Sequence, residues 1–430
     1  MSQSVTLFQA AMRNIYQDDI RMQLNDLNLF RKVRKKQRDE LKLEGNGFVV
    51  ALHSGRNYAG VMSTGESGLL GSAGNQSVDQ LVIPFRDIKG RFGITLEVIE
   101  AAQSSKAAAV PALEFERNRL VEDIERQSNR QFWGYGAGTL AVISAGATSA
   151  TQSLKNPGGV AGTVNPARFV QPGMFVADLT GNTVNSVTQV SSVNQSAGTI
   201  VLASSITTTT NDTLALGSTD GTNNNSSNGI EMMGLNGIVD SSTYLSTIFG
   251  LTRSTKPFFQ SGVATGVGAL SEDFLYRQIH DRWVVSGKKI TDFYTEPSVV
   301  REYIKLTQPD RRYMGGDSPI SPDAGVKGAA VADDGNSGLT FCGIPLTIDK
   351  DGPYGSLFGL VLDNLYVAYL NEGQWEDFGG STGQVLRFVS NKTNYEGVFY
   401  RFLNMYSDRG NVHFRNDGIT TTVDSGIVSD

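Results

Sequence analysis

The chain has 430 residues, which predicts roughly two to three domains. Charged residues are 19% of the total, below the average of about 25%, and glycine is enriched, at 48 residues. The net charge of −6 excludes a globally basic nucleic-acid binder. No apolar stretch reaches the ~20 residues that cross a bilayer, and the acidic pair Asp18-Asp19 interrupts the place of a signal sequence. We therefore expect an intracellular chain with no membrane partner.

The residues that carry most enzyme chemistry are scarce. Cys342 is the only cysteine, and it lies in LTFCGIPLTI, which predicts a buried strand. The three histidines, His53, His280 and His413, are more than a hundred residues apart, and a structural or surface role is the favoured interpretation of each. No G-x-S-x-G motif is present. We expect no catalytic residue, no metal and no cofactor.

Two glycine-containing motifs resemble ligand loops only in part. Residues 65–74 are glycine-rich but lack the Gly-Lys-Ser/Thr ending of a phosphate loop, so a flexible loop is predicted. Residues 349–352, Asp-Lys-Asp-Gly, match a fragment of a calcium loop without its closing Glu, and Pro353 follows. A turn is the better interpretation.

Residues 1–45 have apolar side chains at helical spacing and end in a basic run. Six of the eight residues from 31 to 38 are basic: Arg31, Lys32, Arg34, Lys35, Lys36 and Arg38. One interpretation is a solvated helix face or linker. The other is a contact with a polyanion or an acidic partner.

The next segments predict an extended loop, two strands and a long helix. Residues 46–80 are rich in Gly, Ser and Asn, which is typical of a long loop or hairpin with little core of its own. LVIPF and GITLEV predict strands connected by residues 86–90. A helix is predicted over 111–133, with Pro111 in its first turn and so many charges that it buries little against its own chain.

Composition changes at Gly134. Residues 134–235 contain only six charged residues, and Val, Thr, Ser and Asn alternate between turn glycines. This pattern predicts short antiparallel strands. We interpret residues 141–230 as an inserted β-domain.

Helix signals return after this segment. Ser271 is a predicted N-cap of a helix that runs through Val285, and a second helix is predicted over 297–306. A loop over 315–338 and strands from Leu339 onward complete an α+β chain.

In this order, the segments resemble the Hong Kong 97-like major capsid proteins of tailed bacteriophages. The resemblance rests on RFGITLEVIEAAQSS (91–105), the polar helix ending ERQSNRQFW, the following GYGAGTLA, ITDFYTEPSVVREYIKL (290–306) and FCGIP (341–345). It covers about 300 residues.

The resemblance implies a domain for each segment. These are an N-arm (1–45), an E-loop reaching over a neighbouring subunit (46–90) and a peripheral domain (91–140) with a spine helix (111–133). The inserted β-domain (141–230), a peripheral connection (231–259), an axial domain (260–385) and a return to the peripheral domain with the tail (386–430) follow. The implied function is a non-enzymatic shell subunit that forms hexamers and pentamers around double-stranded DNA.

Two departures from the family pattern limit the comparison. No lysine lies between Lys42 and Lys89, so no covalent cross-link from the E-loop is predicted. Only about 45 residues precede that loop, so a separate scaffolding protein is the expected partner. A portal protein, a decoration protein and packaged DNA, contacted without sequence specificity, are further implied partners. The implied location is the virion capsid, assembled in the host bacterial cytoplasm.

Three other functions compete. An encapsulin-like bacterial compartment shell would share the fold. A carbohydrate-binding β-domain is disfavoured because no Trp lies between 134 and 235 to stack on a sugar. A hydrolase would need a base that three isolated histidines do not obviously supply, although carboxylates stay open.

Overall fold

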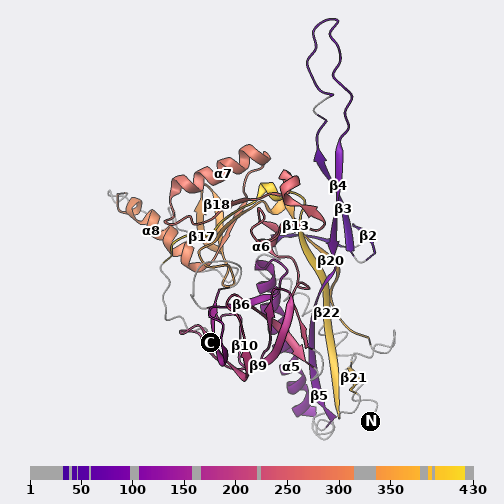
Figure 1. Ribbon diagram of the computed structural model, residues 1–430, viewed down its shortest axis with the longest axis vertical. Coiled ribbons are helices and arrows are strands. Elements are labelled where there is room, and N and C mark those ends of the chain that lie inside the picture. Colours follow the sequence, from indigo (N-terminus) through magenta and orange to yellow (C-terminus); the bar gives the residue numbers. More distant parts are fainter. Residues whose placement is uncertain are drawn as a thin grey trace.

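The computed structural model describes residues 32–37, 41–45, 47–57, 60–96, 106–156, 166–219, 224–313, 336–377, 386–389 and 393–421. Most of the helical segment expected over residues 1–45 and of the loop expected over 315–338 lies outside these ranges. Their described parts include strands at residues 34–37, 42–44 and 336–338, which the sequence did not predict. Figure 1 shows a long sheet on one side of the molecule, a β-lobe beside it, a helix-bearing lobe above, and a narrow hairpin that projects far from all three.

The main sheet is built from strands distant in the sequence. It contains β1 (Arg34–Gln37), β20 (Leu365–Trp375), β22 (Asn394–Ser407) and β21 (Leu386–Phe388) in that order, and β5 (Arg86–Thr95) pairs with β22. The β5–β22 register runs from Arg86 opposite Leu403 to Thr95 opposite Asn394. Alternate residues of β5 are buried, so one face of this strand packs and the other is open.

Helix α5 (Lys106–Trp133) covers the packed face. Leu120 and Ile124 contact a cluster formed by Ile88, Phe92 and Phe399 with Trp375 and Leu386. The helix starts before the expected position 111, so Pro111 is not in its first turn.

The end of α5 contradicts the expectation that this helix buries little against its own chain. Residues 128–133 are all buried, and most are polar. The amide of Asn129 donates to Asp349 at 2.9 Å and to Asp351 at 2.6 Å, and Arg130 pairs with Glu231. Burial is tolerated because these polar groups have partners.

The projecting hairpin contains β3 (Gly47–Gly55) and β4 (Ser77–Pro84), with the short β2 (Lys42–Glu44) beside β3. Its base is part of the main core, because Phe48, Leu81 and Ile83 are almost completely buried. Strand β5 begins directly after β4, so residues 86–90 are strand and not the connection that the sequence predicted.

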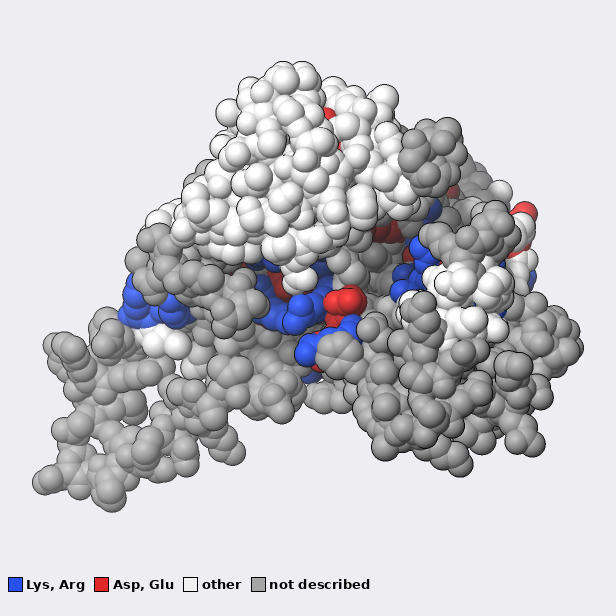
Figure 2. Space-filling model, turned by 90° about the horizontal axis from the view of Figure 1, so that it is seen from below, with Lys and Arg blue, Asp and Glu red and all other residues white. Residues whose placement is uncertain are grey.

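The prediction of short antiparallel strands in this segment is confirmed, and the sheet that they form closes on itself. Its strands are β6 (Thr139–Ile143), β7 (Thr148–Lys155), β8 (Phe175–Thr180), β9 (Thr183–Asn194), β10 (Thr199–Thr207), β11 (Thr213–Thr219) and β12 (Asn224–Ser226). The order is β12-β11-β6-β7-β10-β9-β8, and β11 also pairs with β8, which completes a barrel. Closure leaves the barrel strands without free edges. Seen from below, the molecule presents a broad surface with almost no charge, bordered by a band of Lys and Arg (Figure 2).

The third lobe has a mixed sheet with two helices. Its strands are β15 (Gly262–Ala264), β23 (Phe414–Asn416), β19 (Leu357–Leu360), β16 (Asp292–Thr295), β18 (Ile344–Ile348) and β17 (Asn336–Phe341), in that spatial order. The helices are α7 (Glu272–Ser286) and α8 (Pro297–Tyr313). The short elements α6 (Leu235–Ile238), β13 (Thr247–Ile248) and β14 (Leu251–Thr252) lie in the connection from the barrel.

Two local predictions for this lobe have opposite outcomes. The Ser271 cap is confirmed, because its side chain accepts a hydrogen bond from the Phe274 N–H. The buried strand through Cys342 is wrong. Cys342 (φ = 55°) and Gly343 (φ = 78°) form the tight turn between β17 and β18, and the cysteine is exposed. Left-handed conformation at two successive residues is typical of a two-residue hairpin turn.

Packing of α5 on β5 requires a glycine. A Cβ atom at Gly90 would lie 2.6 Å from Ile124 Cδ1 and 2.7 Å from Leu120 Cδ1. We expect Gly90→Val to lower the free energy of unfolding by about 1–3 kcal/mol, since the helix must move. At Gly93, on the open face, the nearest atom is 3.7 Å away, so Gly93→Val should change stability by less than about 0.5 kcal/mol. Urea denaturation of both variants measures the difference, and equal losses would contradict this packing.

Candidate functional site

The tip of the hairpin is the most exposed apolar surface that the structure describes. Val61, Met62, Leu69 and Leu70 are 78%, 58%, 91% and 87% exposed. Regular pairing of β3 with β4 ends at Gly55 and Ser77, and the chain beyond reaches away from the body (Figure 1). Burying such a side chain gains about 1.5–3 kcal/mol, so covering the projecting apolar tip would be energetically favourable.

The apex of this tip is a turn around a single charged residue. Ser67 has φ = 68°, and the Gly68 N–H donates to the Gly65 carbonyl at 2.9 Å. Glu66 is exposed at this turn and is the one charged residue between Arg56 and Asp79. The expected flexible loop over 65–74 is therefore the end of the hairpin, without helix or strand.

The hairpin base is held by a segment from the connection between lobes. The Val82 N–H donates to the Phe249 carbonyl at 3.2 Å, and Lys256 pairs with Asp79. The hydrogen bond from Lys256 lowers the pKa of Asp79. These contacts fix the direction in which the hairpin leaves the body.

A cavity of about 740 Å³ lies beside the hairpin base. Apolar side chains from the base and the connecting segment line it, namely Val82, Pro84, Met233, Leu245 and Phe249, and the barrel contributes Asn182 and Asn228. The charged residues are Arg86, Glu44 and Glu231. Glu231 is neutralised by Arg130, so Arg86, which is followed by Asp87, and the exposed Glu44 are the other charges of the lining.

Arg86 is the unusual member of this lining. It is half-buried, and burial lowers the pKa of its guanidinium. Within the described ranges of the chain, the Arg86 side chain forms no ion pair and no side-chain hydrogen bond. The charge of Asp87, the next residue, opposes this pKa shift, and an anion that enters the cavity would stabilise the Arg86 cation further.

The basic run predicted as a polyanion contact lies partly on an edge strand instead of a helix face. Strand β1 pairs in parallel with β20, and Lys35 lies opposite Val367. Lys32 Nζ is 3.2 Å from Thr347 Oγ1 and 3.8 Å from an Asp292 carboxylate oxygen.

Two cations of strand β1, Arg34 and Lys36, also contact their own chain. Arg34 pairs with Asp363 at 2.8 Å, and Lys36 Nζ lies 4.3 Å from the centre of the Tyr366 ring. Arg31 and Arg38 lie outside the described residues. Arg34 keeps 60% of its side chain exposed, so contact with an external anion stays a prediction.

The three histidines lie far apart in different surroundings. His53 Nε2 is 2.6 Å from Gln76 Oε1 on the hairpin, and His280 is exposed on α7. His413 is completely buried: its Nδ1 accepts the Val361 N–H at 3.2 Å, and Nε2 lies 3.1 Å from Ser407 Oγ. In the part of the chain that the structure describes, no three His, Cys, Asp or Glu side chains cluster as metal ligands. Among the same residues, no helix is long and apolar enough to cross a membrane.

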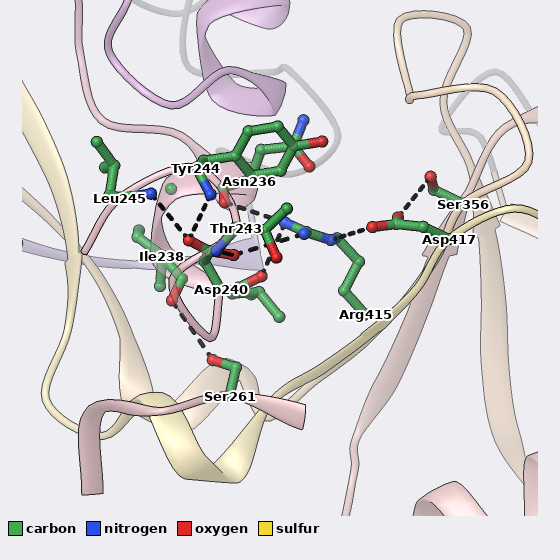
Figure 3. A network of polar contacts seen from close by, with 12 residues as sticks. Asn236, Ile238, Asp240, Thr243, Tyr244, Leu245, Ser261, Ser356, Arg415 and Asp417 are labelled. Carbon is green, nitrogen blue, oxygen red and sulfur yellow. Dashed lines mark hydrogen bonds and ion pairs between the residues drawn. The ribbon is translucent and has the colours of Figure 1, made fainter. Parts of the chain in front are cut away.

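A buried polar network that sequence patterns did not identify joins the connecting segment to the third lobe (Figure 3). Arg253, Arg415 and Asp240 each have no exposed surface. Arg253 donates to the carbonyls of Asp240 and Phe259, both at 2.7 Å, and Arg415 donates to those of Asn236 and Val239, both at 3.1 Å.

The carboxylate of Asp240 completes this network. It accepts the N–H groups of Thr243, Tyr244 and Leu245 at 2.9–3.0 Å and lies 3.5 Å from Arg415. Desolvation lowers the pKa of Arg253 to about 10, which still leaves it charged at neutral pH. The network has no open face and no nucleophile, so its role is structural.

The chain matches no protein-family model and no curated protein. It is similar to solved structures. A cyanophage A-1(L) capsid subunit shares 11% identity over 91% of both chains with a TM-score of 0.50. The capsid of a native GTA particle shares 9% identity over 91% of this chain and 90% of that chain, with a TM-score of 0.46. The encapsulin of the holo-SrpI complex from Synechococcus elongatus PCC 7942 shares 10% identity over 94% and 89%, with a TM-score of 0.41. The similarity to the cyanophage subunit shows that this chain has an α+β capsid fold.

The buried histidine predicts a pH dependence of stability. Desolvation lowers the pKa of His413 to about 3, so between about pH 3 and 6.5 the unfolded chain binds the proton that the folded chain excludes. The contribution of His413 to stability is therefore fully present above about pH 6.5 and is lost as the pH falls toward 3. Between pH 7.0 and 5.5 we expect this group to contribute a loss of about 1 kcal/mol. Urea denaturation of the wild type and of His413→Gln at both values measures it, and an equal loss in the variant would contradict this origin.

The buried network predicts that replacing Asp240 lowers the free energy of unfolding far more than replacing the exposed Asp363. Asp240→Asn should lower the free energy of unfolding by about 3–5 kcal/mol, because it removes the buried anion that acts on both arginines and leaves Asp417 as the counter-ion of Arg415. Asp363→Asn removes the partner of Arg34, where both side chains are more than half exposed, and should cost less than about 1 kcal/mol. Thermal denaturation of both variants compares them. A stable Asp240→Asn protein would show that the carboxylate is not needed.

Proposed function

We propose that this protein is a structural subunit of an icosahedral shell of the tailed-bacteriophage type, which encloses double-stranded DNA. The observation that carries the proposal is the projecting hairpin with its four exposed apolar side chains, on a chain with a capsid fold. An isolated chain leaves this tip in water, whereas a ring of identical chains buries every tip on a neighbour.

The proposed division of labour follows the lobes. Residues 1–45 form an N-arm and residues 46–90 the E-loop, whose last five residues belong to β5 of the main sheet. Helix α5 with the rest of the main sheet forms the peripheral domain. The lobe of α7 and α8 forms the axial domain, and the barrel is an insertion. Hexamers and pentamers of this chain make the shell, with no catalytic step and no cofactor.

The partners in this proposal are a scaffolding protein during assembly, a portal protein, DNA held without sequence readout, and a decoration protein on the outside. Phosphates or acidic scaffold side chains would bind the run Arg31, Lys32, Arg34, Lys35, Lys36 and Arg38. The exposure of Arg34 supports this role, and the contacts of Lys32 and Lys36 within the chain reduce the charge available for it. The finished subunit would reside in the virion, after assembly in the bacterial cytoplasm.

Assembly of the purified chain tests the proposal. We expect sedimentation and negative-stain microscopy to show hexamers, pentamers or shells, either alone or after co-expression with the scaffolding protein. Replacing Leu69 and Leu70 by Ser should reduce the assembled fraction at least tenfold, since two apolar contacts of roughly 1.5–3 kcal/mol each are lost. The matched control replaces exposed Val284 and Val285 on α7 by Ser.

Two outcomes would contradict the proposal. A chain that stays monomeric with every candidate scaffold is not a shell subunit. Shells of wild-type chain that enclose a protein cargo and exclude DNA would instead identify an encapsulin-like compartment.

A further inference from the structure

The barrel is nearly uncharged, and one of its few charged side chains extends out of it. The described residues 139–219 contain four charged side chains, Lys155, Arg168, Asp178 and Asp212. The polar contacts of the lysine and of both aspartates are made with other residues of the barrel. Arg168 is the exception, because its guanidinium group contacts the third lobe.

Arg168 contacts the third lobe in two ways. Its Nη1 donates a hydrogen bond to the Gly352 carbonyl at 3.1 Å, and its Cζ lies 4.5 Å from the centre of the Tyr354 ring. The same Cζ lies 4.5 Å from the ring of Phe169, which belongs to the barrel. A guanidinium group is planar, so it can stack on aromatic rings and donate a hydrogen bond at the same time. Arg168 therefore joins an aromatic side chain of each lobe.

Each end of this contact is fixed within its own lobe. Ala167 and Val170, on either side of Arg168, are buried in the barrel core, and the Val170 N–H donates to the Ala167 carbonyl at 2.9 Å. The turn that carries Gly352 and Tyr354 is held by the third lobe, because the Asp349 N–H donates to the Thr295 carbonyl at 2.9 Å. Arg168 thus connects two rigid parts.

The junction between the barrel and the body is rich in glycine with positive φ. Gly136, Gly138 and Gly229 have φ = 83°, 74° and 70°. Glycine adopts many backbone conformations without steric cost, and short segments of this kind absorb the dihedral changes of a hinge. The barrel strands that the structure describes pair only with one another, so a rotation at the junction breaks no sheet hydrogen bond.

The contact between the barrel and the body is not closely packed beside Arg168. A void of about 50 Å³ lies there. Its lining includes Thr139 and Phe169 from the barrel, Trp133 from α5 and Pro353 from the turn of the third lobe. Side chains that face a void lose part of their van der Waals contacts, so this interface holds the barrel less firmly than a packed core would.

We propose that the barrel is a hinged domain and that Arg168 is the latch that holds it against the third lobe. When Arg168 leaves Gly352 and Tyr354, the barrel turns about the glycine junction. One hydrogen bond to a neutral carbonyl and one aromatic stack are modest attractions, so the latch opens reversibly. The hinge belongs to the single chain and does not depend on association between copies.

The test measures the distance between the barrel and the third lobe in the full-length chain. Cys342 is the only cysteine and is exposed in the third lobe, so it carries one spin label, and Ser192→Cys on the exposed side of β9 carries the second. With Arg168 present we expect one narrow distance distribution by pulsed electron paramagnetic resonance. Arg168→Ala and Tyr354→Leu should each widen it about twofold or add a second distance. Excess unlabelled chain removes distances between copies.

Two controls separate the latch from a general effect of removing an arginine. Arg277 lies on α7, where its Cζ is 5.6 Å from the ring of Phe274 in the same helix. Arg277→Ala therefore removes a similar stack that joins no lobes and should leave the distribution unchanged. Amide hydrogen exchange in β9 and β10 should also be unchanged in Arg168→Ala, because the barrel core is not altered.

Three outcomes would overturn the latch. The first is the same narrow distribution with and without Arg168. The second is a distribution that is already as broad with Arg168 as it is in Arg168→Ala. The third is faster exchange throughout β9 and β10 in Arg168→Ala, which would show that Arg168 supports the fold of the barrel. None of these bears on the proposed shell, and a chain that never assembles would leave the latch in place.

Discussion

The direction of the projecting hairpin depends on a pair of buried arginines. Arg253 and Arg415 are fully enclosed, and their guanidinium groups donate to main-chain carbonyls of the connecting segment. Arg415 also donates to Asp417 and forms an ion pair with Asp240. Removing two cations from water is costly unless acceptors and counter-ions surround them, so the segment can adopt few other shapes. The same segment then holds Val82 and Asp79 at the hairpin base. The buried network thereby sets the direction in which the only long projection of the described chain can reach a neighbour.

The chain enters and leaves the barrel at a single junction. Its two ends meet at the body, where the Gly229 N–H donates to the Ala137 carbonyl at 3.4 Å. Gly138, at φ = 74°, has the Ser227 carbonyl oxygen 2.7 Å from where a Cβ would lie, so the junction requires glycine. Closely spaced ends permit a whole domain to be inserted without moving the strands on either side. With few charges of its own, the barrel also adds little long-range electrostatic force to association between subunits.

The basic N-terminal strand shows how local charge and tertiary structure combine. A run of cations is normally a solvated surface, but β1 completes an edge of the main sheet. Asp292, Asp363 and the ring of Tyr366 come from distant parts of the chain and meet Lys32, Arg34 and Lys36. These cations therefore help to hold β1 against the rest of the chain. Of the three, Arg34 keeps an exposed side chain that another molecule could contact. An edge strand protected in this way is also less able to pair with a stray chain.

Elements that depend on near neighbours in the sequence were predictable. Alternating Val and Thr between glycines predicted the barrel strands, Ser271 predicted the start of α7, and the Gly- and Ser-rich stretch predicted the long hairpin. Their signals are local because hydrogen-bond caps, turns and strand periodicity involve residues a few positions apart. Local patterns failed at Cys342, where a run of apolar residues concealed a tight turn. Nothing local marks Arg253 and Arg415 as buried or Arg86 as half-buried, since their surroundings come from distant residues, such as Asn236, 179 positions from Arg415. Whether a charged side chain is solvated, paired or stranded in a cavity is decided by those distant neighbours, and so only by the tertiary structure.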